Sequence, residues 1–461
     1  MAGIISTALG KVKNDWRSLL APELILAICR AVGHRWRRRE FGPVETVQLF
    51  LLQVLHGNTA LTHLSHLWGS FVSASAFCAA RKRLPLAVWQ LLLELLTKRF
   101  VDGSQGLWHG MRVWLVDGSG FSMPDTSELA RHFGYPATQR KGCGFPVAYL
   151  IALMDVTTGI IRHVRALPGH RREMPYMPTL HNWLGKGDVL VGDRGLCSFV
   201  QLAMLLQKGM HAVFRMHGSQ RIDFTPGRPY TTWRMRERAR NWARVDKKQR
   251  GNKQKLPPTS RWIKSLGPFD QLVAWLKPEK RPGWMTAQQY AALPDELEVR
   301  ELRYRINMPG FRVREVTLVT TLLDAEEFPM SALRQLYAWR WRIETNFRHL
   351  KTTMGLDALK CQSVEGMCKE LAVFALIYNM VRIVMHAAAN YHELPIDRIS
   401  FIDAQRWLAS GGAIPVQELV INPERPNRVE PRMVKRRPKH YPRLPAPRAK
   451  VRNMIIDNTM C

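Results

Sequence analysis

The chain has 461 residues, 46% of them hydrophobic and 23% charged, which are ordinary values for a globular protein of two or three domains. Its charge is not ordinary, because 68 Lys and Arg face 37 Asp and Glu and give a net charge of +31. Such an excess repels itself unless a polyanion offsets it, so it indicates a nucleic-acid partner. A generally cationic protein or a membrane-surface binder is the alternative.

The seven cysteines are scattered without a CxxC pair, which argues against a structural zinc site and a disulfide framework and favours a reduced compartment. Charged residues between positions 11 and 17 interrupt the N-terminal apolar residues, so no signal peptide is predicted. The most apolar stretch, Leu371 to Ala389, contains Asn379 and Arg382 and predicts a buried helix rather than a membrane span.

Residues 1 to 107 are predicted to be helical, since Pro43 to Gly57 and Pro85 to Phe100 carry apolar residues at helical spacing. Two short helices between them, around Gly69, resemble a helix-turn-helix, although a helical bundle is equally compatible. The second of these helices ends in a basic triplet, Arg81, Lys82 and Arg83. An earlier basic run, Arg35, Arg37, Arg38 and Arg39, fits either a DNA contact or a solvated face.

Strands are expected from about residue 108. The apolar run Val113 to Val116 is predicted to be a strand that stops at Asp117, and Gly118 follows it. A carboxylate at the end of a buried strand projects into the cleft at that sheet edge, although Asp-Gly also begins many turns. Residues 145 to 167 then predict a hairpin, and a helical segment is expected at 177 to 184.

The same arrangement recurs further on. Val189 to Val191 is predicted to be a strand with Asp193 just after its end, followed by a helix at 198 to 209 and a strand at 211 to 216. Two carboxylates brought together repel one another, and a hard cation between them removes the repulsion. Asp117 and Asp193 are therefore candidates for a shared metal site.

Residues 217 to 314 are predicted to form a β-rich insertion with a DNA-facing surface, because arginines and lysines form a dense run from 234 to 250 that includes Trp233 and Trp242. Strands are expected at Gln271 to Trp275 and Leu297 to Ile306, and 314 to 323 resumes the core sheet. Beyond Pro423 the chain is rich in Pro and Arg, which favours an extended or disordered arm.

Tyr337 to Lys351 is predicted to be one helix, with Ser331 as the N-cap of its first turn. At about 100° per residue, four polar side chains share one face: Tyr337, Arg340, Glu344 and Lys351. Taken alone, a carboxylate between cations is more often a structural ion pair than a catalytic group. A second helix is expected at 364 to 389.

These residues together resemble a known family. The order Asp117, Asp193, Glu344, in the settings VDGS and GDRGLCS, is similar to the DDE triad of RNase H-like transposases. The spacing from Tyr337 to Lys351 is similar to the YREK signature of bacterial transposases of the insertion-sequence-four family. The resemblance covers roughly residues 110 to 392 and the RRPKxYP tail, whereas the N-terminal part is similar only in being helical and basic.

The resemblance implies an α/β fold, an RNase H-like mixed sheet flanked by helices, with a β-rich insertion and an all-helical N-terminal domain. Its expected divisions are 1–107, a helical DNA-binding domain; 108–216 and 315–392, the two parts of the catalytic core; 217–314, the insertion; and 393–461, a C-terminal region with a basic tail.

The implied activity is DNA transposition: the protein would bind terminal inverted repeats, cleave the ends through hairpins and join the 3′ ends to target DNA. Asp117, Asp193 and Glu344 would be the catalytic residues and the ligands of two Mg²⁺ ions, with Mn²⁺ able to substitute. Expected DNA contacts come from the helix of the signature and from the N-terminal basic triplet: Tyr337, Arg340, Lys351, Arg342, Arg348, Arg81, Lys82 and Arg83.

The resemblance also implies a homodimer on paired DNA ends, in the bacterial cytoplasm with the nucleoid and without a membrane. It further implies an aromatic residue of the insertion that stacks on a flipped base, a role open to Trp233, Trp242, Trp262, Trp275 and Trp284. The alternative is a catalytically silent, sequence-specific DNA-binding protein, such as a domesticated element or a repressor.

Overall fold

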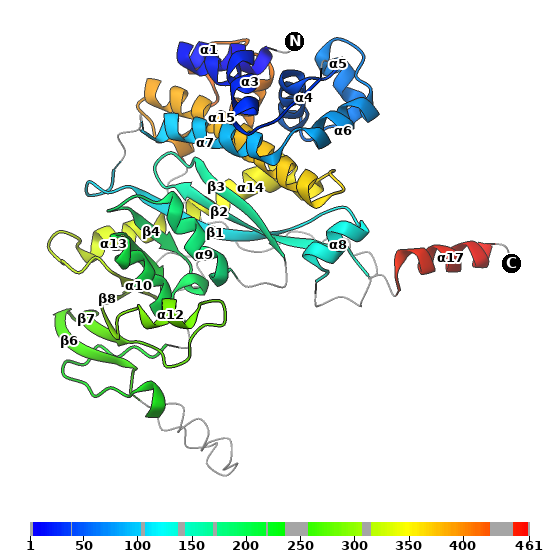
Figure 1. Cartoon of the computed structure of the whole chain (residues 1–461). Helices are drawn as coiled ribbons and strands as arrows, with labels where there is room; N and C mark the ends of the chain where they lie inside the picture. Colours follow the sequence, from blue (N-terminus) through cyan, green and yellow to red (C-terminus); the bar gives the residue numbers. More distant parts are fainter. Residues whose placement is uncertain are drawn as a thin grey trace.

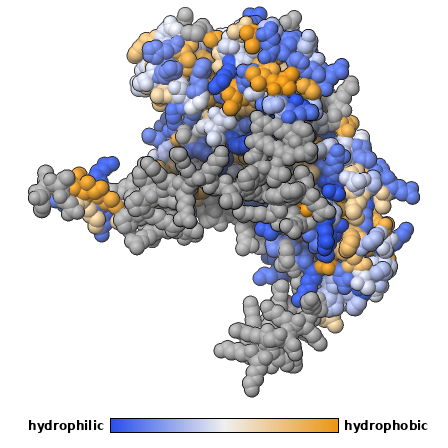
Figure 2. Space-filling view, turned by 180° about the vertical axis from the view of Figure 1, so that it is seen from behind, coloured by the Kyte–Doolittle hydropathy of each residue, from blue (hydrophilic) through white to orange (hydrophobic). Residues whose placement is uncertain are grey.

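The computed structural model of the chain describes residues 3–37, 39–102, 107–136, 143–168, 173–217, 220–235, 257–306, 315–424 and 446–459. Within them the fold is mixed α/β, with a helical part above a long sheet (Figure 1). Seen from behind, the described surface is largely hydrophilic, and hydrophobic residues gather in small patches on the helical part and on the C-terminal helix (Figure 2).

One nine-stranded sheet has the order β3-β2-β1-β4-β5-β9-β8-β7-β6. Its strands are β1 Val113–Ser122, β2 Val147–Asp155, β3 Ile161–Pro168, β4 Val189–Gly192, β5 His211–Arg215, β6 Ser260–Gly267, β7 Asp270–Leu276, β8 Glu296–Arg305 and β9 Glu315–Thr320. The first three strands pair antiparallel, whereas β1 with β4 and β4 with β5 pair parallel. This arrangement of β1 to β5 is the RNase H-like core that the resemblance implies.

The strands of the insertion extend this same sheet, because β8 pairs antiparallel with β9 and carries β7 and β6 beyond it. The two strands predicted here are present as β7 and β8. Strand β6 and the short helix α12 (Ala287–Ala291) were not predicted, since β6 lies at the sheet edge and is only partly buried. Most of the basic run, from 236 to 250, lies outside the described residues.

The helical part combines both ends of the chain, and α15 runs among the N-terminal helices (Figure 1). Its helices are α1 Ile4–Val12, α2 Asn14–Arg17, α3 Pro22–Ala31, α4 Pro43–Leu55, α5 Leu64–Trp68, α6 Ala74–Arg83, α7 Leu86–Asp102, α15 Val364–Tyr391 and α16 Phe401–Ala409. Helix α15 is apolar and long enough to cross a membrane, but 89% of its most apolar window is buried in the protein. The prediction of a buried helix is confirmed.

Polar side chains of α15 fasten it to the β2–β3 hairpin. The Asn379 side-chain amide accepts from the backbone N–H of Ile161 at 2.8 Å and donates to its carbonyl at 2.9 Å. Since β3 is an edge strand, this amide completes backbone pairing that a neighbouring strand would otherwise provide. Arg382 donates to the carbonyl of Thr158 in the same turn, so the helical part is held to the sheet.

The remaining helices flank the sheet or follow it. They are α8 Ser127–Phe133, α9 Met177–Leu180, α10 Phe199–Gln207, α13 Met330–Ala338, α14 Trp341–Arg348, a π-helix at His349–Thr353 and α17 Arg448–Thr459. Helix α13 begins at Met330 after the N-cap Pro329, so the expected cap at Ser331 was wrong. The RRPKxYP tail lies outside the described residues, and α17 follows it.

A buried ion pair joins the insertion strands to the loop before α13. Arg300 on β8 is 1% exposed, and its Nε lies 2.8 Å from Oδ1 of Asp270 on β7. The same guanidinium group donates to the carbonyl of Phe328 at 2.6 Å. One side chain therefore connects β7, β8 and the start of the segment that carries Glu344.

Arg300→Leu is expected to lower the free energy of unfolding by about 3–5 kcal/mol, because it leaves the carboxylate of Asp270 buried without its partner. The matched control is Arg261→Leu, which breaks the exposed pair with Glu296 and should lower the free energy of unfolding far less. Denaturant unfolding of both variants measures the difference. Equal losses in the two variants would contradict the assignment.

Candidate active site

The first candidate carboxylate, Asp117, lies inside a strand. The prediction that the strand stops at Val116 was wrong, because β1 continues to Ser122 and Asp117 pairs with Ala152 of β2. The polar residues after Asp117 hid this continuation, since their pairing with β2 is not visible in local periodicity. The parallel pairing with β4, however, ends at Val116 and Gly192. Asp117 therefore occupies the first position at which β1 has no partner in β4.

The second candidate, Asp193, follows β4 directly, as predicted. Continuing the register by one position sets Asp193 opposite Asp117 on strands that lie about 4.8 Å apart. Asp117 accepts from the N–H of Gly118 at 2.8 Å, and Asp193 accepts from the N–H of Arg194 at 2.6 Å. The sheet thus brings together the two carboxylates that the sequence separates.

The third candidate lies on a helical segment that is not one continuous helix. The chain turns at Trp339 and Arg340 between α13 and α14, and the π-helix follows α14. Arg340 nevertheless keeps right-handed helical angles, with φ −53° and ψ −31°. Two residues of the expected polar face, Arg340 and Lys351, both contact β1.

Arg340 lies between the carboxylates rather than on the surface. One terminal nitrogen is 3.1 Å from Oδ2 of Asp117, and the other is 3.2 Å from Oε1 of Glu344. The arginine side chain is 9% exposed and that of Asp117 is 19% exposed, whereas that of Glu344 is 47% exposed. A single guanidinium group therefore neutralises one buried and one half-exposed carboxylate.

Tyr337 is 4% exposed and packs near the Arg340 guanidinium group, which lies 5.7 Å from the centre of its ring. Burial raises the pKa of its phenol, and its hydroxyl has no hydrogen-bond partner among the described residues. Lys351 donates to the carbonyl of Gly120 at 2.8 Å and lies 3.6 Å from Asp357. Lys351 therefore contacts β1, and Tyr337 is buried beside Arg340.

The other predicted DNA contacts lie away from the carboxylates. Arg342 pairs with Asp397 at 3.1 Å, and Arg348 is exposed on α14. Arg81 donates to Gln53 at 3.2 Å and lies over aromatic rings of the N-terminal core. Lys82 and Arg83 are exposed at the end of α6.

Sequence reasoning missed Glu173 and Tyr149. The Tyr149 hydroxyl donates to the carboxylate of Glu173, which lies close enough to raise the pKa of Asp117. The ring of Tyr149 covers Gly118, where an added Cβ would come within 2.0 Å of its Cε1. Gly118 is therefore required for this contact. Glu173 carries no spacing or strand-end signal, because it follows the basic residues His170, Arg171 and Arg172 outside any predicted element.

The pKa of Asp117 is raised to about 6, chiefly by burial. The Gly118 N–H and Arg340 oppose this rise, whereas the carboxylates of Asp193 and Glu173 add to it. Burial likewise raises the pKa of Glu173. A cluster of acids with raised pKa values at the edge of a sheet is typical of a functional site.

The donor chemistry fits a divalent cation, since carboxylate oxygens are the ligands that Mg²⁺ prefers and Asp117 and Asp193 occupy neighbouring positions. Among the described residues, however, no three acidic, histidine or cysteine side chains converge on one point. The Arg340 guanidinium group lies between Asp117 and Glu344 and supplies the positive charge there.

Comparison with known proteins gives a consistent picture. The family model described as the transposase DDE domain matches residues 108–380, more than half of the chain. The chain is 26% identical over 406 residues to the transposase InsG for insertion sequence element IS4 of Escherichia coli K12, covering 81% of this chain and 79% of InsG. A second protein of that organism, InsZ, is 28% identical over 103 residues, which cover 22% of this chain and 34% of InsZ.

Among solved structures, the cryo-EM structure of the piggyBac transposase synaptic complex with hairpin DNA is similar to this chain. The alignment covers 87% of this chain and 80% of the piggyBac chain. The TM-score is 0.45 and the sequence identity is 11%.

Asp117→Asn is expected to stabilise the metal-free protein above pH 6. Asp117 ionises near 3.8 when unfolded and near 6 when folded, so its contribution to stability is lost as the pH rises through that interval. The variant avoids this loss, which amounts to at most about 3 kcal/mol. Unfolding curves in a chelator should therefore coincide below pH 4 and separate above pH 6.

The matched control is Asp295→Asn, whose side chain is 97% exposed and which should change the free energy of unfolding little. Equal stability of Asp117→Asn and the wild type at pH 8 would contradict the buried, acid-crowded setting of Asp117.

Proposed function

The chain belongs to the family of transposases with a DDE domain, and on that premise we propose that Asp117, Asp193 and Glu344 carry its DNA cleavage and strand transfer. The observation that supports this most directly is the bridge made by Arg340. It holds Asp117 and Glu344, from distant parts of the chain, to one guanidinium group at 3.1 and 3.2 Å. Asp193 occupies the adjoining register position.

The same three carboxylates would hold Mg²⁺, at two ions per site. When bound, the metal supplies activation of the attacking hydroxyl and neutralisation of the charge that develops on the phosphate. The protein side chains need not form a covalent bond with DNA in such a site. Their contribution is to hold the reacting strand and to balance charge.

Arg340 and Lys351 contact β1 at Asp117 and Gly120, so the two cations flank the site along the strand. We assign to them the grip on the phosphates of the strand being cut. Arg340 balances the buried acids before the DNA arrives and contacts a phosphate afterwards. Tyr337 packs on Arg340 and positions it.

The substrate would be the terminal inverted repeats of the insertion sequence, cut with hairpin ends and joined through their 3′ hydroxyls to target DNA. The net charge of +31 supports a polyanionic substrate such as DNA. InsG is a transposase of an insertion sequence, and this chain aligns with 79% of its length. A homodimer would hold both ends, so that each is processed while the other is bound.

Glu344→Gln is expected to reduce Mg²⁺-dependent cleavage of end DNA by more than about a hundredfold while leaving end binding within about twofold, because it removes a ligand charge that acts only in the reaction. A gel assay on labelled ends, with a binding assay alongside, measures both quantities. The matched control is Glu326→Gln, an exposed glutamate in the loop before α13, which should leave both unchanged. Full cleavage by Glu344→Gln would overturn the assignment. Loss of binding together with cleavage would show a folding defect instead.

A further inference from the structure

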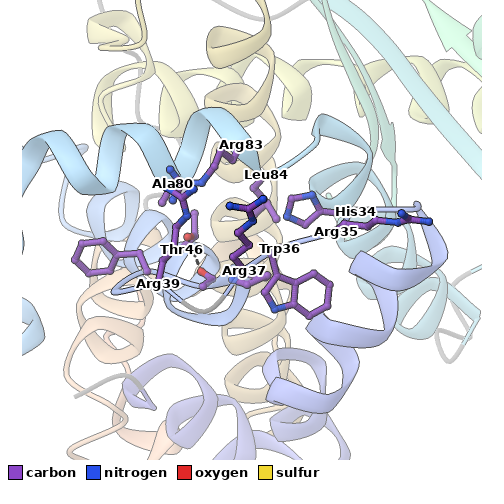
Figure 3. Close-up of a pocket in the computed structure, with 12 residues that line it drawn as sticks. His34, Arg35, Trp36, Arg37, Arg39, Thr46, Ala80, Arg83 and Leu84 are labelled. Carbon is purple, nitrogen blue, oxygen red and sulfur yellow. Dashed lines mark hydrogen bonds between the residues drawn. The ribbon is translucent and has the colours of Figure 1, made fainter.

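A second charged site lies in the helical part, away from the carboxylates. The loop between α3 and α4 and the C-terminal end of α6 enclose a cavity of about 350 Å³. Figure 3 shows its lining: His34, Arg35, Trp36, Arg37 and Arg39 from the loop, and Arg83 and Leu84 from α6 and the residue after it. This is the basic run that the sequence left open between a DNA contact and a solvated face.

The lining is strongly cationic and uncompensated. Its lining residues include no acid. Four arginines contribute to it, namely Arg35, Arg37, Arg39 and Arg83. Two acids follow the basic run in the sequence. Glu40 is exposed and is not among the lining residues, and Glu45 accepts from the N–H of Gly42 at 3.0 Å and caps α4. None of the ion pairs among the described residues involves these four arginines. These four arginines are exposed, and an anion bound between them would offset their mutual repulsion.

An aromatic pair completes the site. Trp36 is 37% exposed and stacks on His34, with ring centres 5.8 Å apart and an interplanar angle of 22°. Burial lowers the pKa of His34, and the charges of Arg83 and Lys369 lower it further. His34 is therefore neutral at neutral pH and can support the indole without adding charge. An exposed indole among arginines suits contact with a sugar or base beside a bound phosphate.

The cavity is connected through α15 to the sheet that carries Asp117. Lys369 of α15 donates to the carbonyls of Arg81 at 3.2 Å and Lys82 at 3.0 Å, which fixes the last turn of α6. Helix α15 also carries Asn379, which binds the backbone of β3. Hydrogen bonds of α15 therefore connect the α6 side of the cavity with the sheet that carries Asp117.

We propose that this cavity binds the sugar–phosphate backbone of DNA, with a phosphate among Arg37, Arg39 and Arg83 and with Trp36 against the neighbouring nucleoside. The proposal rests on the function assigned above and names a second anchor for the same DNA. Its recognition is independent of base sequence, because phosphate contacts carry no sequence information. The anchor sets the register of the duplex relative to the carboxylates.

The test is the salt dependence of end binding in the full chain. Arg37→Ala/Arg39→Ala is expected to weaken binding at least tenfold and to make the slope of log K against log [KCl] shallower by up to about 0.9, since the site holds one phosphate and each lost phosphate contact removes about 0.9 from the slope. The matched control, Arg17→Ala/Arg30→Ala, removes two exposed arginines from α2 and α3 and should change the slope by less than about 0.3. Fluorescence anisotropy with a labelled end duplex measures both.

Trp36→Ala separates stacking from charge, because it should weaken binding about three- to tenfold at an unchanged slope. Melting curves of all variants confirm that they fold.

Wild-type slope and affinity in Arg37→Ala/Arg39→Ala would overturn the proposal, as would an equal loss in the control pair. If the wild type binds ends through this site but does not cleave them with Mg²⁺, the anchor stands and the catalytic assignment falls. Competition by inorganic phosphate alone, with DNA binding unaffected in the variants, would identify a small-anion site and also overturn it.

Discussion

The guanidinium group of Arg340 is the interaction on which the site depends. Burial makes the charge on Asp117 costly, and the carboxylates of Asp193 and Glu173 add to this cost. Without an internal cation the carboxylates of Asp117 and Glu344 would repel each other and solvent would have to enter. Arg340 contacts both, although it lies 223 residues from Asp117 in the sequence. It holds the carboxylates of Asp117 and Glu344 to one cation.

The arrangement around Arg340 follows from the sheet and from α15. The parallel register of β1 and β4 sets Asp117 beside Asp193, and no single strand could do so. The antiparallel pairing of β8 with β9 leads the chain back to the core before α13, so the segment with Glu344 starts from a position fixed by the sheet. Helix α15 packs on β3 and on α4 and α7. The helical part and the carboxylates consequently belong to one framework, through which a DNA contact on one bears on the other.

Much of this could be predicted from the sequence, and the failures have a common cause. The hairpin, the strand before Asp193 and α15 were predicted because their periodicity is local. Strand β1 beyond Asp117, edge strand β6 and the turn at Arg340 were not, because each depends on a partner far away in the chain. Glu173 was missed for the same reason: only the fold brings it to Tyr149 and Asp117. The roles of the site residues and the domain boundaries stay predictions.

The arginines show why composition indicates a partner but not its place. Arg300, Arg340 and Arg382 are buried, and each has its charge or its hydrogen bonds matched within the protein. Arg37, Arg39 and Arg83 belong to the same residue type but line a cavity that contains no acid. A guanidinium group that the fold neutralises contributes to the framework, whereas one left uncompensated beside an exposed indole favours an external anion. The net charge of +31 adds both kinds together, and only the structure separates them.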